Sequence, residues 1–432
     1  MPSGSLARSV AMLAGSTAVG QLVAVAASPV LTRLFTPGEM GLLGVYTATV
    51  LLLMPVASGR YELAIPLARR EDTAANLLAV SLLVALALSA IVGAVVYLWG
   101  DPLLRMVDAT ELRPHLWLFP LGLLSAAGYQ ALSGWAIRAK EFGEIARTRL
   151  SQSVLMVLVQ LGGGAIGGGT AILLLGDALG RAGGTLRLGR LTWTRSRTAL
   201  GRVRWSRMVR AAHRYRRFPL ISSGSALLNT AGLQLPALLL AALYGPHVAG
   251  WFILGQRVIG LPSRLVGQAI GQVYVGEAAR LIRERPEALP GLFHRLVRRL
   301  LLVGAVPVVM VGLVAPPVFA RVFGAEWHSA GVYVWWLTPM FVAQIVVSPI
   351  SQSAALLERQ GVQLVADALR TVAVFAAIGG AALLDWSDTA AVGAYSLCML
   401  VTYVAYFEVY RRLLRSVAQR ADTPGSRTRP VS

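Results

Sequence analysis

The stretch that decides the fold is RLGRLTWTRSRTALGRVRWSRMVRAAHRYRR, which runs from Arg187 to Arg217 and is called the basic segment below. It contains eleven arginines, and no Asp or Glu occurs between Asp177 and Glu277. Long apolar stretches flank it on both sides. Arginine-rich runs also bind nucleic acid, but flanks long enough to cross a bilayer argue against that partner. The basic segment therefore predicts a loop that divides a membrane protein into two halves.

Residues 204–217 within the basic segment have the pattern of an amphipathic helix. The apolar positions at helical spacing are Trp205, Met208, Val209 and Ala212. The arginines that fall mostly on the opposite face are Arg204, Arg207, Arg210, Arg214 and Arg217. A helix of this kind lies in the membrane interface, where anionic lipids of the inner leaflet attract its arginines. We therefore expect this helix to lie on the inner leaflet.

The composition is typical of a chain embedded in lipid. Hydrophobic residues make up 56% of the sequence and charged residues only 14%, against about a quarter in soluble domains. The net charge of +20 comes from 40 basic residues, of which only Lys140 is a lysine. A single cysteine, Cys398, allows no internal disulfide. The apolar run after Arg8 is too long for a signal-peptide core, so we expect an uncleaved first span.

Twelve apolar segments are long enough to cross a bilayer, since about 20 residues suffice. The predicted organisation is an N-terminal six-helix half (1–186), the basic segment (187–217), a C-terminal six-helix half (218–414) and a disordered cytoplasmic tail (415–432). With the N-terminus inside, 32 basic residues fall in inner segments, four in outer segments and four within spans. The positive-inside rule then predicts that both termini are cytoplasmic.

A short repeat marks the same position in each half. Residues 35–41 and 244–250 share the pattern of an aromatic residue, any residue, proline, three residues and glycine. Each copy follows the first span of its half. Because six spans is an even number, the two halves have the same orientation and are parallel repeats. Proline and glycine as turn formers would explain each copy alone, but not their equivalent placement.

Signatures of catalysis are missing from the sequence. The glycine cluster at 162–167 matches a dinucleotide-binding pattern, but no strand–turn–helix context surrounds it, so it predicts a tight turn. We find no zinc-protease, nucleophile-elbow or phosphate-loop motif and no paired Asp-x-Asp. The sequence therefore predicts no catalytic residue, no metal and no cofactor, and favours a transporter over an enzyme.

The arginines inside spans are the best candidates for function, because charge at mid-membrane depth is costly and usually faces a cavity. In the eighth span, six residues share one helix face: Arg257, Gly260, Arg264, Gly267, Gln268 and Gly271. Arg257 would lie roughly 15 Å deep at 1.5 Å per residue. The candidate substrate-binding residues are Arg257, Arg264, Gln268 and, at the outer end of the first span, Arg33. The alternative is that these arginines pair with carbonyls or remote carboxylates and only hold helices together.

Two acids lie inside spans beside an arginine. Asp177 and Arg181 are four residues apart, and Asp367 and Arg370 are three apart, so each pair can meet on one helix face. Structural neutralisation is the first interpretation. An acid that takes a proton or Na⁺ during transport is the alternative, and Asp177 is the deeper candidate for ion coupling.

Two motifs carry a resemblance to a known family. Residues 31–41, LTRLFTPGEMG, resemble the first-span signature of the bacterial polysaccharide and O-antigen repeat-unit flippases, and residues 60–65, RYELAI, resemble the sequence after their second span. These Wzx-type proteins belong to the multidrug/oligosaccharidyl-lipid/polysaccharide exporter superfamily. The resemblance implies an all-α integral membrane protein with twelve transmembrane helices in two parallel six-helix repeats around a central cavity.

The same resemblance implies the substrate. Flippases of this family move undecaprenyl-diphosphate-linked oligosaccharide units across the bacterial cytoplasmic membrane for surface polysaccharides such as lipopolysaccharide O-antigen or exopolysaccharide. The expected partners are this lipid-linked oligosaccharide and the polysaccharide polymerase machinery. Arginine suits a diphosphate, because its fork of donors matches phosphate oxygens and it stays charged.

Two other functions stay open at this stage. A cation-coupled multidrug antiporter of the same fold would need carboxylates facing its cavity, whereas the deep charges of the eighth span are positive. A membrane glycan polymerase or ligase would need catalytic groups on the outer face, where the predicted loops are short. Both are therefore alternatives to the flippase.

Overall fold

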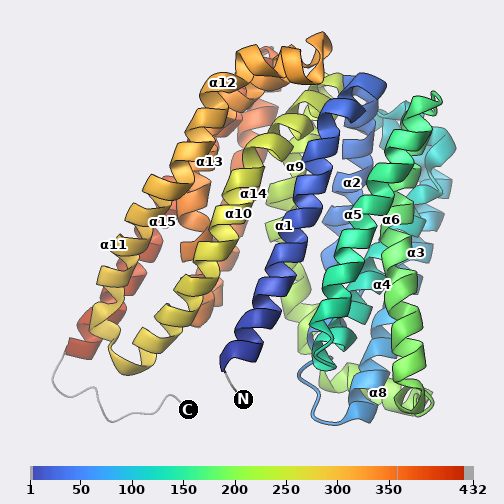
Figure 1. Ribbon diagram of the computed structural model, residues 1–432, viewed down its shortest axis with the longest axis vertical. Coiled ribbons are helices and arrows are strands. Elements are labelled where there is room, and N and C mark those ends of the chain that lie inside the picture. Colours follow the sequence, from blue (N-terminus) through green and yellow to red (C-terminus); the bar gives the residue numbers. More distant parts are fainter. Residues whose placement is uncertain (1–2, 358, 423–432) are drawn as a thin grey trace. The chain divides into compact units, whose positions relative to one another are not determined.

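The computed structural model describes the backbone of residues 3–357 and 359–422 and most of their side chains. Regular structure in these residues is entirely helical (Figure 1). The long helices are α1 (Ser3–Leu34), α2 (Pro37–Ala57), α3 (Glu71–Met106), α4 (Leu118–Arg138), α5 (Phe142–Ala165), α6 (Gly169–Arg195), α9 (Ser223–Tyr244), α10 (Pro246–Glu284), α11 (Leu289–Arg299) continued through a π-helical stretch by α12 (Val306–Phe323), α13 (His328–Leu356), α14 (Gln360–Leu383) and α15 (Asp388–Asp422). With α11 and α12 taken as one, the described part of the chain has the predicted twelve-helix architecture.

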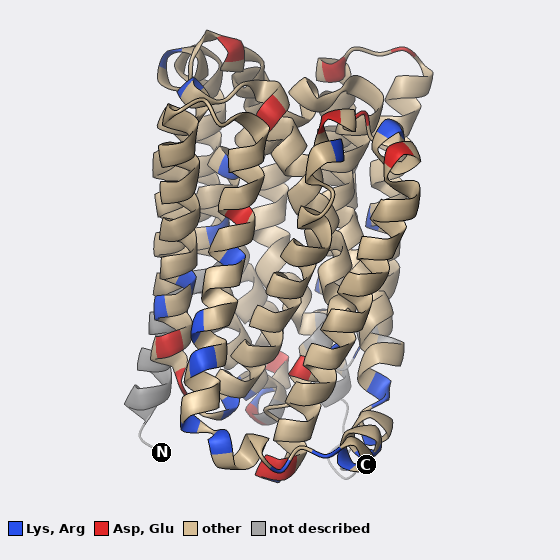
Figure 2. Ribbon diagram, turned by 90° about the vertical axis from the view of Figure 1, so that its right-hand side faces the viewer, with Lys and Arg blue, Asp and Glu red and all other residues tan. Residues whose placement is uncertain are grey.

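Eight of the helices in the described residues are long and apolar enough to cross a membrane. The helices below that threshold are α4, α5, α6 and α10. The last three carry arginines and acidic residues among their apolar residues, which lowers their hydropathy without shortening them. Figure 2 shows that charged residues gather toward the ends of the long helices, whereas the middles of most helices are uncharged. The chain is therefore a multi-pass membrane protein whose charged side chains lie mostly toward the helix ends.

The chain divides into two compact units. Unit 1 comprises Met1–Ile253 and Val322–Trp327, and unit 2 comprises Leu254–Arg321 and His328–Ser432. In unit 1, α5 packs against both α1 and α6, and α6 also packs against α4 (Figure 1). In unit 2, α15 packs against α13 and α14. The hydroxyls of Tyr274 on α10 and Ser353 on α13 share a 2.5 Å hydrogen bond within unit 2.

Glycines set the close approach of α5 and α6. A Cβ added at Gly176 would lie 2.5 Å from the Gln160 side chain, and one at Gly180 would lie 2.9 Å from the Gln152 carbonyl oxygen. Gly184, one turn further along, would meet the Gln152 side chain at 2.1 Å. The three glycines are spaced by four residues, so they form one smooth ridge on α6. Small residues at this spacing let two helix backbones pack closely in a membrane.

The two copies of the sequence repeat meet each other inside unit 1. A Cβ on Gly41 of α2 would lie 1.8 Å from the carbonyl oxygen of Pro246. A Cβ on Gly250 of α10 would lie 1.9 Å from the carbonyl oxygen of Pro37. Each glycine therefore packs against the proline carbonyl of the other copy. Such reciprocity is the mark of a contact between twofold-related surfaces, and we call it the reciprocal glycine contact.

Local sequence fixes where these two helices begin. At the start of α2, the Thr36 backbone N–H donates to the Glu39 carboxylate at 2.8 Å, and the Glu39 N–H donates to the Thr36 hydroxyl at 3.3 Å. This capping box places Pro37 at the first helical position, where a missing N–H costs nothing. Before α10, Gly245 takes a left-handed φ of 92°, and Pro246 again follows as the first helical residue. Both motifs therefore start a helix at the residue that makes the contact.

The basic segment is more helical than a loop. Arg187, Arg190 and Arg195 belong to α6, which continues to Arg195 past the predicted end of the N-terminal half at 186. Two short helices follow, α7 (Arg197–Leu200) and α8 (Trp205–Arg214). Residues 187–195 contain no proline, and their leucines and arginines are good helix formers, so α6 continues through them.

The last helix also extends beyond the predicted span. α15 runs to Asp422 and so includes the first part of the predicted tail at 415–432, while residues 423–432 lie outside the described residues. Neither glycine nor proline occurs between Tyr410 and Asp422. Glu408 forms ion pairs with Arg411 at 2.7 Å and Arg412 at 2.8 Å, on the turn that follows it. Such pairs support a helix that has left the apolar layer.

Candidate functional site

The two predicted arginines of α10 lie on one face and approach each other. The guanidinium of Arg264 folds back along the helix and donates a hydrogen bond to the carbonyl oxygen of Arg257 at 3.3 Å. Long helical side chains point toward the helix N-terminus, which explains the direction. The two cations are close enough to interact electrostatically. The structure therefore places the Arg264 guanidinium against the backbone of Arg257 on α10.

A glycine makes room for this arrangement. A Cβ at Gly260 would lie 2.9 Å from Nη1 of Arg264 and 3.4 Å from the Phe341 ring of α13. The guanidinium thus rests on bare helix backbone beside an aromatic ring. A Cβ at Gly267 would meet no atom within 4 Å. Gly260 is the glycine that the packing of Arg264 requires, and Gly267 faces open space.

The other predicted site residues are placed differently. Arg33 is exposed at the end of α1 and belongs to unit 1. The preceding residue, Thr32, accepts a 3.0 Å hydrogen bond on its carbonyl from the indole N–H of Trp327, also in unit 1. Gln268 follows Arg264 by one turn on α10, but its side chain lies outside the described residues. Only Arg257 and Arg264 are therefore joined by a described contact.

Asp177, the candidate for ion coupling, is buried on α6 in a two-point ion pair. Its carboxylate accepts from Nε of Arg181 at 2.6 Å and from Nη2 at 3.0 Å. The Arg181 carbonyl oxygen accepts in turn from the hydroxyl of Thr185 at 3.1 Å. Fork-to-fork geometry of this kind is the strongest that arginine and a carboxylate form. The acid is therefore neutralised on its own helix.

The second intramembrane pair is enclosed by aromatic hydroxyls. Asp367 and Arg370 on α14 are both buried and lie 3.0 Å apart. The hydroxyl of Tyr403 on α15 hydrogen-bonds with Arg370, and that of Tyr406 donates to the Ala366 carbonyl oxygen. The spacing of Asp367 and Arg370 predicts their pairing, whereas the two tyrosines come from another helix, on which residues 403 and 406 share a face by their spacing of three.

The basic segment docks onto unit 1 at the start of α3. The Asp72 carboxylate lies 3.2 Å from a guanidinium nitrogen of Arg202 and 3.9 Å from one of Arg207. The side-chain oxygen of the buried Asn76 accepts a 3.2 Å hydrogen bond from the backbone N–H of Arg204, just before α8. The N–H groups at a helix start need partners from outside the helix. Asp72 and Asn76 therefore anchor α8, a role that sequence analysis did not assign.

The predicted apolar face of α8 is divided between two surroundings. Met208 and Ala212 pack against the buried core that α3 and α4 form with Ala211. Trp205 and Val209 are 68% and 52% exposed. The prediction of a single membrane-facing side is therefore wrong for Met208 and Ala212, because unit 1 itself covers them. The exposed strip lies roughly 60° around the helix from the buried one, at 100° per residue.

The anchor at Asn76 gives a first testable prediction. Asn76→Ala removes the acceptor of the Arg204 N–H, and an unsatisfied buried donor costs about 1–3 kcal/mol. The basic segment should then detach more often, and limited trypsin digestion of the purified protein should cut its arginines several-fold faster. Thr73→Ala, in the same turn of α3, is the control. Equal cleavage of both variants and the parent protein would show that Asn76 does not hold α8.

The comparisons with known proteins give both a family and a fold. Residues 30–331 match the family model described as polysaccharide biosynthesis protein. No curated protein matches the sequence significantly. An inward-facing multidrug resistance MATE family transporter of the MOP superfamily is 15% identical with a TM-score of 0.71, over 94% of this chain and 96% of that chain. The lipid II flippase MurJ, in an inward closed conformation, is 8% identical with a TM-score of 0.74, over 95% and 90%.

A further structure, the Vibrio cholerae MATE transporter VcmN in its bent form, has a TM-score of 0.58 at 15% identity, over 96% of this chain and 98% of that chain. Identities this low establish the fold alone, which is the predicted all-α membrane fold. The family match confirms the resemblance carried by residues 31–41 and 60–65. Because that match covers more than half of the sequence, the chain belongs to the polysaccharide biosynthesis protein family.

Proposed function

We propose that the chain is a flippase that moves undecaprenyl-diphosphate-linked oligosaccharide units across the bacterial cytoplasmic membrane. The family match supports a role in polysaccharide biosynthesis, and a protein of similar fold is a flippase for lipid II. The observation that carries the proposal is the Arg264 guanidinium, which lies beside Gly260 and donates a hydrogen bond to the carbonyl oxygen of Arg257 on the same face of α10. Two arginines on one face of a membrane helix are suited to the diphosphate of such a substrate.

The depth of the two arginines suggests how the substrate moves. At 1.5 Å per residue from Pro246, Arg257 lies roughly 16 Å and Arg264 roughly 27 Å along α10. In a hydrocarbon layer of about 30 Å, these depths correspond to the middle and to the inner edge. The diphosphate would meet Arg264 first and then Arg257. Arg33 and Gln268 are the further residues that we propose for the same substrate.

Movement would follow from rocking of one six-helix half, 1–186, against the other, 218–414. A site near the bilayer midplane then opens first to the inside and then to the outside. The basic segment at 187–217 connects the halves. Its exposed Trp205 and Val209 would rest on the inner leaflet, where anionic lipids attract the surrounding arginines. The polysaccharide polymerase machinery is the partner that would receive the exported unit.

The two alternatives fit the side chains less well. A cation-coupled multidrug antiporter needs accessible acids, whereas Asp177 is paired with Arg181 and Asp367 with Arg370. Ion coupling at Asp177 would first have to break a two-point ion pair. A glycan polymerase or ligase needs an outer-face catalytic group, and sequence analysis found no motif for one. The arginines of α10 do not suit a cavity that binds cationic drugs.

The proposed orientation can be tested by labelling. In a Cys398→Ala background, a cysteine at Ile166, which is 84% exposed between α5 and α6, should react with a membrane-impermeant maleimide added to intact cells. A cysteine at Ser206 on α8 should react only after the cells are opened. The reverse pattern would place the basic segment outside and contradict the orientation.

The function itself is tested by complementation. Expression of the chain in a bacterial strain that lacks its polysaccharide-unit flippase should restore surface polysaccharide and reduce the pool of lipid-linked units on the inner leaflet. The matched control is the same strain with the empty vector. Resistance to cationic drugs without any restored polysaccharide would favour the antiporter instead.

A further inference from the structure

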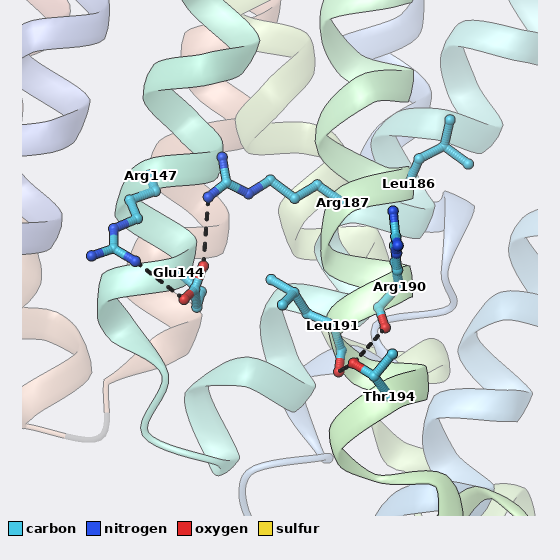
Figure 3. A pocket seen from close by; sticks show the side chains of 7 residues that line it. All are labelled: Glu144, Arg147, Leu186, Arg187, Arg190, Leu191 and Thr194. Atoms are coloured by element: carbon cyan, nitrogen blue, oxygen red, sulfur yellow. Dashed lines mark hydrogen bonds and ion pairs between the residues drawn. The ribbon is translucent and has the colours of Figure 1, made fainter.

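A cavity of about 550 Å³ lies between α5 and α6 of unit 1, and none of its described lining residues belongs to α10 (Figure 3). Three arginines line it: Arg147 on α5, and Arg187 and Arg190 on α6. The single acid among the lining residues is Glu144. The cavity therefore carries more positive than negative charge, and the substrate site proposed above does not use it.

Glu144 holds two of these arginines in place. Its carboxylate lies 3.4 Å from Nη1 of Arg147 and 3.7 Å from Nη2 of Arg187, which reaches across from α6 (Figure 3). The Glu144 side chain is 16% exposed, against 71% for Arg147 and 42% for Arg187. The acid thus forms the inner wall, and the guanidinium groups reach outward. Each guanidinium has five N–H donors, so most remain available after one contact with Glu144.

Both helices place the arginines at the same depth. Arg147 and Arg187 each lie roughly 27 Å along their helix from its end at the Ala165–Gly169 turn, at 1.5 Å per residue. Arg190 lies roughly 32 Å from that turn. The hydrocarbon layer is about 30 Å thick, so a turn at one membrane surface places these arginines at the opposite edge. That edge is where the phosphate groups of lipids lie.

Apolar side chains next to the arginines complete an amphiphilic site. Leu186 and Leu191 line the cavity with them, and Leu186 is 73% exposed. Toward the middle of the bilayer, Leu179 on α6 and Leu158 on α5 are also exposed, at 46% and 61%. An acyl chain can follow these leucines while its headgroup stays at the guanidinium groups. A free phosphate ion would gain nothing from them.

We propose that this cavity binds the phosphate of an anionic phosphoglycerolipid from the cytoplasmic leaflet. The proposal rests on the membrane orientation proposed above, but not on transport. Arg147, Arg187 and Arg190 donate to the phosphate, and Leu186 contacts the acyl chain. The Glu144 carboxylate takes up part of the positive charge of the arginines, and the exposed leucines beside them suit the acyl chains of a bilayer lipid.

The test is lipid binding to the delipidated full-length protein in detergent, measured by native mass spectrometry with dioleoylphosphatidylglycerol. Combined Arg147→Gln, Arg187→Gln and Arg190→Gln should weaken the tightest bound lipid by about tenfold or more. The control changes three exposed arginines outside both the cavity and the basic segment, Arg69, Arg105 and Arg321, to Gln and should weaken it less than about twofold.

A second variant should change lipid affinity in the opposite direction. Glu144→Gln removes the opposing charge and leaves the three arginines, so it should tighten phosphatidylglycerol binding several-fold. The measurement with Glu144→Gln still tests the proposal if the triple variant does not fold. Dioleoylphosphatidylcholine, which is neutral overall, should bind the parent protein far more weakly.

Three results would overturn the proposal. Equal binding by the parent protein and the well-folded triple variant would mean that the cavity holds no lipid. Displacement of phosphatidylglycerol by millimolar inorganic phosphate would identify a free-anion site. Tighter binding of undecaprenyl diphosphate, lost in the triple variant and not displaced by phosphatidylglycerol, would identify a substrate site. Because transport is not measured, none of these results depends on whether the protein is a flippase.

Discussion

Gly41→Ala and Gly250→Ala should each prevent the protein from accumulating as a well-folded species. The added Cβ would lie 1.8 Å from the Pro246 carbonyl oxygen in the first variant and 1.9 Å from the Pro37 carbonyl oxygen in the second. Both clashes are with backbone, so no side chain can rotate away. The starts of α2 and α10 would have to separate, at a cost of about 3 kcal/mol or more. The measurement is the monodisperse yield and melting temperature of the purified protein.

The control uses glycines that face open space. A Cβ on Gly276 or on Gly379 would meet no atom within 4 Å. Gly276→Ala and Gly379→Ala should therefore leave yield unchanged or raise it, because alanine favours a helix by about 1 kcal/mol over glycine. If Gly41→Ala and Gly250→Ala melt at the parent temperature as these controls do, the reciprocal glycine contact is not a tight one.

Arg257→Ala combined with Arg264→Ala should abolish surface polysaccharide in the complemented strain while the protein accumulates normally. The arginines would contribute to binding the substrate, and each lost charge-assisted contact with phosphate costs about 1.5–3 kcal/mol. A loss of more than about a hundredfold follows if both contacts act on one diphosphate. Arg257→Lys should rescue only part of the activity, since lysine keeps the charge but loses the two-point fork.

Gly260→Ala tests whether the position of the Arg264 guanidinium matters, because the substitution moves this group without removing it. The new Cβ would lie 2.9 Å from Nη1 of Arg264, and that side-chain end can move away, so folding should survive. Polysaccharide display should still fall, because Arg264 would lose its place beside Arg257. Arg321→Ala, at the exposed end of α12, is the control for loss of one positive charge. Normal surface polysaccharide in the Gly260→Ala variant would show that the position of the Arg264 guanidinium does not matter for transport.

Helix number and the repeat could be predicted because both depend on local sequence. A run of about 20 apolar residues forms a helix in lipid whatever surrounds it, since its backbone groups have no other partners. The motifs at residues 35–41 and 244–250 likewise have a local effect, because each determines where a helix begins. Their reciprocal contact was not predictable, because equivalent placement along the chain does not say that the two copies touch.

The surroundings of the charges could be predicted only in part. Asp177 and Arg181 pair across one helical turn, so their spacing was sufficient. The anchors of α8 were not found, because Asn76 lies far from Arg204 in the sequence. Hydrophobic spacing also could not tell that Met208 would face protein and Trp205 would stay exposed, since both surroundings are apolar.

The most direct measurement is translocation by the purified protein in proteoliposomes. The probe is a fluorescent oligosaccharide on a polyprenyl diphosphate, and its arrival in the far leaflet is read by a membrane-impermeant quencher. A neutral polyprenyl glycan and a cationic drug are the comparison probes. If the chain is a flippase that holds a diphosphate at Arg257 and Arg264, only the diphosphate probe should cross, and the double alanine variant should reduce its rate to that of protein-free liposomes. Equal rates for the parent protein and that variant, or transport of the cationic drug alone, would contradict this function.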